Sequence, residues 1–280
     1  MVLLLGYKYL TILYQRVLRR TRIPILVYHA ISDKPHAYGV TRETFVRHIS
    51  FIRQNHTFVR LKDIKSAFRK PNGLRPVIIT FDDAYTSFFE KAFPILEQLS
   101  IPCTVFVPTG YIGGRNEWDR QPEPLAGTEV MSKEQLRALD SSGWVDIGSH
   151  SVDHVRMSQL SIDAMSYQVI ASKRCLEELL GHSICAFSYP YGQLDDFSTS
   201  TCTILADAGY DIAVTTHWGT LHSTEHLLRL RRISVSESDT FADIKDKLEG
   251  QYDWIAMKER VGYIKRCFQH YTRRWASWEM

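Results

Sequence analysis

The stretch Val77-Ile78-Ile79-Thr80-Phe81-Asp82-Asp83 is an apolar run that ends on two adjacent carboxylates. Its composition predicts a buried strand of a parallel sheet, because such strands are covered on both faces. Burying an unpaired carboxylate costs several kcal/mol, and two adjacent carboxylates also repel each other. We therefore expect this strand to end at a functional site. The alternative for an isolated Asp-Asp pair is a turn or a helix N-cap.

A second polar cluster, Gly148-Ser149-His150-Ser151-Val152-Asp153-His154, favours the functional interpretation. Its two imidazoles and one carboxylate of the Asp pair form a His₂Asp donor set for a divalent metal, with room left for water. The other Asp of the pair is then available as a base. The combination predicts metal-assisted hydrolysis.

The composition sets further bounds. The chain has 280 residues, 44% of them hydrophobic, which suffices for one large α/β domain or two small ones. A net charge of +3 is close to balanced, so we expect no nucleic-acid partner. The five cysteines are odd in number and contain no C-x-x-C pair, which indicates free thiols in a reducing compartment.

Strand-like and helix-like segments alternate along the chain. The predicted strands are 24–29, 58–61, 77–83, 103–107, 144–148, 186–192, 212–215 and 229–235. The predicted helices are 41–52, 62–70, 84–99, 132–139, 162–180, 197–208 and 241–248. This alternation predicts a parallel sheet, and its spacing favours a closed or distorted (β/α) barrel. Polar residues at the strand ends, His29 among them, would then meet at one face of the barrel.

The two termini differ from this pattern. Residues 1–22 are apolar and aromatic, then rich in arginine, and at about 15 apolar residues they are too short to span a bilayer. With no signal-peptide features, they predict an interfacial anchor helix; a helix packed on the protein's own body is the alternative. The basic, aromatic tail 251–280 favours the same membrane surface. The main domain would be 23–250, cytoplasmic and peripheral on the inner face of the membrane, or else anchored with the domain outside the cytoplasm.

Three motifs together resemble the polysaccharide deacetylase family, also known as the NodB homology or carbohydrate esterase 4 family. They are Thr80-Phe81-Asp82-Asp83, His150-Ser151-x-x-His154 and Phe187-Ser188-Tyr189-Pro190-Tyr191-Gly192. The likeness covers residues 24 to 235. It implies a distorted (β/α)7-type barrel, here with helical, basic extensions at both ends.

The resemblance also implies roles for individual residues. Asp83, His150 and His154 correspond to the family's metal ligands, and Asp82 corresponds to its general base. The metal is expected to be zinc, with nickel or cobalt as alternatives. By the same resemblance, Pro190 and Tyr191 would line the substrate groove beside Tyr189, and the Tyr191 backbone N–H would help to hold the oxyanion.

The chain departs from the family pattern in two places. Many members carry an arginine that orients the base where Ser188-Tyr189 stand here, and no Leu-x-His supplies the usual acid near the C-terminal end. The Val27-Tyr28-His29 segment resembles instead the subgroup that de-N-acetylates poly-β-1,6-N-acetylglucosamine. That likeness makes His29 the expected general acid. We expect Arg231 or Arg232 to replace the missing arginine beside Asp82.

Other polar and aromatic residues carry weaker expectations. Trp118 in a long loop would form the floor of a sugar subsite, or else pack within that loop. Asp153 would orient a ligand histidine through its second ring nitrogen, or remain solvated. A cluster of three histidines is expected to be surface rather than a second metal site: His217, His222 and His226.

The sequence therefore predicts a metal-dependent N-deacetylase. Its partner would be an N-acetylated glycan or glycolipid: an N-acetylhexosamine-containing polysaccharide or a lipid-linked sugar. One alternative keeps the site but changes the bond to an O-acetyl ester or another amide. A second alternative is an inactive scaffold that binds glycan or membrane.

Overall fold

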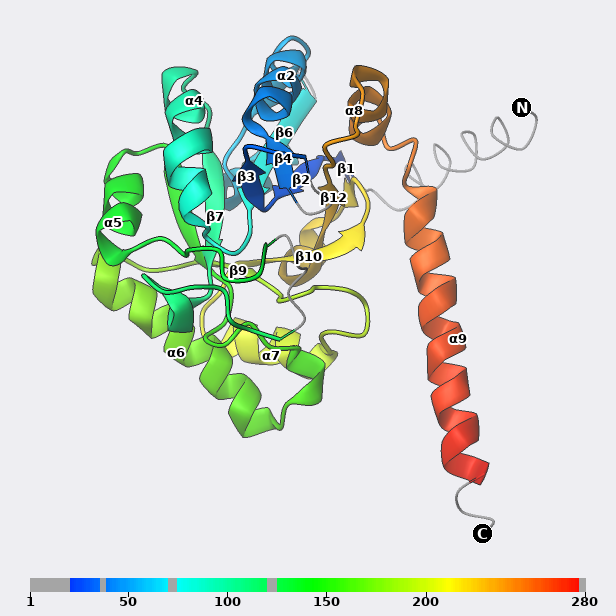
Figure 1. The fold of residues 1–280 in the computed structure, drawn as a ribbon. Coiled ribbons are helices and arrows are strands. Elements are labelled where there is room, and N and C mark those ends of the chain that lie inside the picture. Colours follow the sequence, from blue (N-terminus) through cyan, green and yellow to red (C-terminus); the bar gives the residue numbers. More distant parts are fainter. Residues whose placement is uncertain (1–20, 36–38, 70–74, 120–124, 277–280) are drawn as a thin grey trace, which may run out of the picture.

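Seven parallel strands close into a barrel in the computed structural model, which describes residues 21–35, 39–69, 75–119 and 125–276. The order around the barrel is β2-β12-β10-β9-β8-β7-β6, and pairing of β2 with β6 closes it (Figure 1). The strands are β2 (Ile25–Tyr28), β6 (Arg75–Phe81), β7 (Cys103–Val107), β8 (Val145–Ser149), β9 (Ala186–Ser188), β10 (Ile212–Trp218) and β12 (Leu230–Ser234). The predicted (β/α)7-type barrel is confirmed.

Five short strands lie outside the seven-stranded barrel, and four of them form two separate two-stranded sheets. β5 (His56–Phe58) pairs with the first half of β6, and β3 (Ala30–Ser32) pairs with β4 (Gly39–Thr41). β1 (Thr21–Arg22) runs antiparallel to β11 (Leu221–His222). The last two residues of the predicted N-terminal helix therefore belong to a strand. The rest of that helix, 1–20, lies outside the described residues.

Helices cover the outside of the barrel (Figure 1). They are α2 (Arg42–Arg53), α3 (Ile64–Ala67), α4 (Phe93–Gln98), α5 (Lys133–Ser141), α6 (Ile162–Leu180), α7 (Thr199–Asp207), α8 (Phe241–Leu248) and α9 (Trp254–Ala276). Ser132, Ser198 and Thr240 begin α5, α7 and α8 with reciprocal capping boxes, which satisfy backbone N–H groups of the first turn. These local signals explain why the predicted helices from 132, 197 and 241 begin close to where they were expected.

Some predicted boundaries were wrong for physical reasons. The helix expected over 84–99 begins with a π-helical turn, Phe88–Ala92, and becomes α-helical only at Phe93. Pro94 lies in the first turn of α4, where its missing N–H costs least. The helix expected over 62–70 is reduced to a 3₁₀ turn, Leu61–Asp63, and the short α3. The strand expected over 186–192 ends at Ser188.

The barrel strands carry polar residues to a single end. Ile78, Ile79 and Phe81 of β6 are fully buried, and Asp82 and Asp83 follow directly after them. His29 likewise follows β2, Ser188 ends β9, and His150 follows β8. Because these strands are parallel, their carboxyl ends meet at one face, as in other (β/α) barrels.

Helix α9 leaves the body of the barrel after α8 and extends away from it (Figure 1). Its first turns contact β10: Ala256 is buried, and the Glu259 carboxylate accepts the Trp218 backbone N–H at 3.0 Å. Within the described ranges, no helix combines the length and the apolarity needed to cross a membrane.

Candidate active site

Asp83, His150 and His154 converge at the C-terminal face of the barrel. Their candidate ligand atoms all lie within 4.8 Å of one another. Asp83 Oδ1 is 3.5 Å from His150 Nε2 and 3.3 Å from His154 Nε2. All three side chains are buried. The structure thus brings together the three residues that the sequence predicted as metal ligands.

The chemistry of this donor set fits a divalent cation. The His150 Nδ1–H donates to the Ser188 carbonyl at 2.7 Å, so the lone pair of Nε2 faces Asp83. Asp83 Oδ1 is buried and accepts no hydrogen bond from any described residue. A buried carboxylate oxygen without a donor is costly, and a cation shared with two imidazoles removes that cost.

The orienting acceptor differs from the expected one. Asp153 is exposed and accepts a hydrogen bond from Gln168 Nε2 at 2.6 Å, so it does not reach a ligand histidine. The Ser188 backbone carbonyl performs that task for His150. Of the two expectations for Asp153, the solvated residue agrees with the structure. The orienting acceptor is a backbone carbonyl, and backbone acceptors carry no signature in the sequence.

The loops that hold the ligands have strained backbones. Five non-glycine residues at this face have positive φ angles: Asp83 at 70°, Ala84 at 50°, Ser151 at 65°, His154 at 51° and Tyr191 at 59°. Such conformations are uncommon for residues with a Cβ and concentrate at functional sites. Surrounding contacts hold them in place, for example the hydrogen bond from the His154 N–H to Ser151 Oγ at 3.1 Å.

Asp82 forms a buried ion pair with Arg232. Arg232 Nη1 donates to Asp82 Oδ1 at 2.7 Å, and Nη2 donates to Oδ2 at 2.5 Å. Ser188 Oγ adds a hydrogen bond to Oδ2 at 3.2 Å. Burial by itself raises the pKa of Asp82, but the charge and hydrogen bonds of Arg232 lower it below its ordinary value. Asp82 is therefore a carboxylate at neutral pH, held in a fixed orientation.

The arginine beside Asp82 is Arg232 rather than Arg231. Successive side chains of a strand point to opposite faces, so β12 sends Arg232 into the barrel and Arg231 outward. Arg232 Nε also donates to the Thr215 carbonyl at 2.8 Å, which locks the guanidinium in place. Arg231 lines a separate cavity on the outside of the barrel wall.

His29 lies beside the same carboxylates. It follows β2, is half-buried, and is close enough to contribute, after burial and the larger partners, to the pKa of both Asp82 and Asp83. The structure therefore places the predicted acid at the same face as the predicted base.

Aromatic side chains surround His154 at the mouth of the site. The Trp118 ring stacks on the His154 ring with centroids 4.6 Å apart, and Tyr191 meets it edge-on at 5.0 Å. Tyr191 donates its hydroxyl to the Asp119 carbonyl at 2.7 Å, and the Arg156 guanidinium lies 4.5 Å over its ring. A cavity of about 510 Å³ borders these side chains and includes Trp118, His154, Arg156 and Tyr191 in its lining. Trp118 thus supports a ligand histidine and also borders the groove.

Tyr189 and Pro190 differ from Tyr191. Tyr189 is fully buried, donates its hydroxyl to the Leu228 carbonyl at 2.8 Å, and stacks on Phe197. Its expected contact with substrate is not supported, because its side chain packs in the core. Pro190 is buried next to Tyr191 and does not belong to the cavity lining.

Tyr85 and Asn116 are site neighbours that the sequence analysis missed. The Tyr85 hydroxyl accepts a hydrogen bond from Asn116 Nδ2 at 3.0 Å. Burial, and then the charge of Asp83, raise the pKa of Tyr85. Its position two residues after Asp83 was the available signal, but nothing in the local pattern distinguished it from a helix residue.

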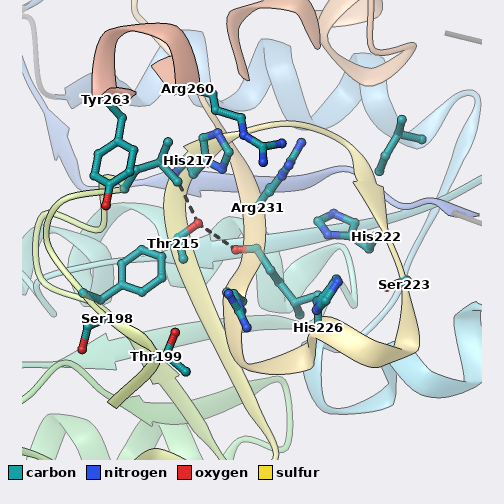
Figure 2. Close-up of a pocket in the computed structure, with 15 residues that line it drawn as sticks. Ser198, Thr199, Thr215, His217, His222, Ser223, His226, Arg231, Arg260 and Tyr263 are labelled. Atoms are coloured by element: carbon teal, nitrogen blue, oxygen red, sulfur yellow. Dashed lines mark hydrogen bonds between the residues drawn. The ribbon is translucent and has the colours of Figure 1, made fainter. Parts of the chain in front are cut away.

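Of the three histidines expected on the surface, His226 is exposed as predicted, and the other two are not. His217 and His222 are buried, and both line the outer cavity with His226 (Figure 2). In the part of the chain that the structure describes, only Asp83, His150 and His154 group closely enough to hold a metal.

A seven-stranded parallel barrel with these polar strand ends has the architecture of the NodB homology class. The chain belongs to the polysaccharide deacetylase family, because residues 69–213, more than half of its length, match that family. Membership makes the protein a carbohydrate deacetylase, a hydrolase. The resemblance inferred from the three motifs is confirmed.

Individual relatives agree with this assignment. YxkH of Bacillus subtilis (strain 168), which carries a polysaccharide deacetylase name, is 25% identical over 219 residues, covering 77% of this chain and 72% of the relative. The poly-β-1,6-N-acetyl-D-glucosamine N-deacetylase of Staphylococcus aureus (strain MRSA252) is 26% identical over 196 residues, covering 65% and 64%. The structure of IcaB from Ammonifex degensii superimposes with a TM-score of 0.69 at 25% identity, covering 82% of this chain and 97% of IcaB.

Proposed function

We propose that this protein is a metal-dependent N-deacetylase acting on N-acetylhexosamine units of a polysaccharide or a lipid-linked sugar. The observation that carries the proposal is the buried Asp82–Arg232 pair directly beside the Asp83, His150 and His154 donor set. The staphylococcal relative, named for N-deacetylation of poly-β-1,6-N-acetyl-D-glucosamine, supports the choice of an acetamide.

Asp83, His150 and His154 would hold the divalent cation. The mixed nitrogen and oxygen set suits zinc best, with nickel and cobalt as alternatives. When bound, such a cation supplies a Lewis acid for the acetamide carbonyl and a more acidic water. The remaining steps belong to side chains of the chain itself.

Asp82 would take the proton from the attacking water, and Arg232 keeps this carboxylate ionised and aligned for the transfer. An amine leaves poorly unless it is protonated, so the mechanism also needs an acid. His29 would supply that proton. The Tyr191 backbone N–H would stabilise the developing oxyanion. Trp118 and Tyr191 would present aromatic surfaces to the sugar rings.

The test is release of free amine from N-acetylglucosamine oligomers by the metal-loaded protein, compared with Asp82→Asn. Activity that Asp82→Asn abolishes supports the proposal. Comparison of acetamide and O-acetyl ester substrates separates the N-deacetylase from the esterase alternative. Lack of turnover on every acetylated glycan and glycolipid tried, with the metal site full, would favour the scaffold alternative.

We also propose that the protein is cytoplasmic and binds the inner face of an anionic membrane through α9. Trp254, Met257, Val261 and Ile264 lie 3, 4 and 3 residues apart and are between 41% and 61% exposed. Helix geometry puts this spacing on one face, opposite Ala256 and Glu259, which contact the barrel. An exposed apolar stripe with basic flanks is typical of helices that lie in a membrane interface.

The charges beside this stripe favour lipid over a second copy of the chain. Lys258 and Lys265 flank the stripe on one side, and Arg260 lies on the other. In a parallel coiled-coil dimer, Arg260 would face Lys265 of the second copy, and like charges at these positions oppose pairing. Anionic headgroups instead attract each basic residue by about 1 kcal/mol.

Vesicle sedimentation tests this second proposal. Vesicles with phosphatidylserine should pellet the protein more than vesicles of phosphatidylcholine alone, and Ile264→Glu should abolish the difference. Ile170→Glu is the matched control, because Ile170 is similarly exposed but lies on α6. Equal sedimentation of both variants would contradict the assignment to α9. Accessibility to protease in intact cells distinguishes the alternative in which the domain lies outside the cytoplasm.

A further inference from the structure

A second cavity lies outside the barrel wall, between the start of α7, strands β10 and β12, and helix α9 (Figure 2). Its volume is about 460 Å³. It is separate from the groove at Trp118. Arg231 of β12 lines the outer cavity, whereas its neighbour Arg232 lies on the opposite face of the same strand and binds Asp82. The mechanism proposed above does not use this cavity.

Among the described residues, the charged side chains that line this cavity are arginines, and histidines that can become cations. Three arginines come from three elements: Arg229 from the 3₁₀ turn before β12, Arg231 from β12, and Arg260 from α9. His217 and His222 add buried imidazoles. None of the described residues that line the cavity is acidic. Such an arrangement favours an anion.

Two carboxylates lie close to this lining. Glu259 accepts the Trp218 backbone N–H at 3.0 Å and lies 3.2 Å from His217 Nε2. Asp253 accepts the backbone N–H and the hydroxyl of Thr220 at 3.0 and 2.8 Å. Both act electrostatically on Arg231, but neither lines the cavity.

Two of these arginines also act on His217. Burial, followed by the charges of Arg231 and Arg260, lowers its pKa to about 4. The N-terminus of α7 also favours an anion. Ser198 and Thr199, at the start of this helix, line the cavity, so the positive end of the helix dipole lies against it.

We propose that this cavity is a binding site for an organic phosphate. Arginine guanidinium groups match phosphate oxygens with paired N–H donors, which makes phosphate the anion this lining fits best. Phe197 and Tyr263 supply apolar and aromatic lining for the organic part. The volume falls within the range of about 300–1,000 Å³ found for small-molecule sites, so the ligand is larger than a bare phosphate ion.

Two sources share this chemistry. The first is a sugar phosphate, and the second is the phosphate of a phospholipid headgroup, since α9 supplies Arg260 and Tyr263 to the cavity and carries the exposed apolar stripe. Calorimetric titration of the full chain separates them. The probes are N-acetylglucosamine 1-phosphate and glycerol 3-phosphate, with N-acetylglucosamine and glycerol as unphosphorylated controls at matched ionic strength.

Binding of either phosphate ester, without binding of its control, is the expected result. The ester that binds with the higher affinity identifies the source. Arg260→Gln and Arg231→Gln should each weaken binding by about tenfold or more, which corresponds to loss of one charge-assisted contact. Arg174→Gln is the control, because Arg174 is exposed on α6 and its described partner is Glu178.

Arg260 is exposed on a helix, so Arg260→Gln tests the site even where Arg231→Gln fails to fold. Neither residue belongs to the deacetylase machinery, so amine release from N-acetylglucosamine oligomers by Arg260→Gln should equal that of the wild type. The proposal is overturned if neither ester binds above its control, or if Arg260→Gln and Arg174→Gln bind the esters as tightly as the wild type.

Discussion

The Arg232 guanidinium donates two parallel hydrogen bonds of 2.7 and 2.5 Å to the Asp82 carboxylate. The Arg232 side chain is 0% exposed and the Asp82 side chain 3%. The residues stand 150 positions apart in the chain. Planar pairing of this kind fixes both the charge and the direction of the carboxylate. The carboxylate then faces the metal donor set with Ser188 as its third contact.

Arg232→Gln should lower both stability and activity. Removing one partner of a buried ion pair leaves an uncompensated charge, which costs about 3–5 kcal/mol. Urea unfolding of Arg232→Gln should show that loss, and the folded fraction should retain little amine release. The double variant Asp82→Asn with Arg232→Gln should recover part of the stability but none of the activity. An active and fully stable Arg232→Gln would show that the pair does not position the base.

Metal content distinguishes the donor set from its neighbours. Asp83→Ala and His154→Ala should each lose the metal that the reconstituted wild type retains, because each removes one of three protein ligands. Asp153→Ala should keep it, since the Asp153 carboxylate bonds to Gln168 instead. Elemental analysis of the purified proteins is the measurement. A wild type that holds no metal after reconstitution would contradict the assignment.

Tyr189 and Tyr191 should respond differently to truncation. Tyr189→Ala should destabilise the fold by about 3–5 kcal/mol, as expected for a fully buried aromatic side chain. Tyr191→Ala should cost less stability but raise KM for acetylated oligomers, because Tyr191 borders the groove. Thermal unfolding and steady-state kinetics of the two variants provide the comparison. The assignment fails if Tyr189→Ala folds normally and alone raises KM.

His217 should make the stability depend on pH. Its pKa is about 4 in the folded chain and 6.5 as an ordinary histidine, so the unfolded chain binds a proton first as the pH falls. This group's contribution is therefore constant above about pH 6.5, declines between pH 6.5 and 4 by up to about 3 kcal/mol, and is constant again below. His217→Gln should flatten that decline in urea unfolding measured without phosphate.

His182 provides a control with the opposite sign. A hydrogen bond to Asp140 raises its pKa, so its contribution is present at low pH and is lost as the pH rises through the folded pKa. His182→Gln should therefore leave the decline between pH 6.5 and 4 in place. An unchanged profile in His217→Gln would mean that the buried imidazole is not the source.

The barrel and the candidate donor set could be predicted from the residue pattern alone. Apolar strands alternate with amphipathic helices along the chain. The spacing of apolar residues identifies each element as strand or helix and shows which face is buried, and this alternation predicts a parallel barrel. The motifs around Asp83, His150 and His154 follow strands directly, so the parallel sheet alone brings them to one end. Capping residues such as Ser132 also indicate where helices begin, because a cap acts only on the first turn of its own helix.

Three features became apparent only in the folded chain: the arginine that holds Asp82, the group that orients His150, and the inward packing of Tyr189. The choice of Arg232 over Arg231 depends on the register of β12 against β10 and β2. The acceptor for His150 is the Ser188 carbonyl, a backbone atom 38 residues away. The same holds for the outer cavity, where arginines from three elements meet His217 and His222. These contacts depend on which face of a strand a side chain occupies and on which backbone atom it meets. Both depend on how distant segments pack, so a local pattern of residue types does not reveal them.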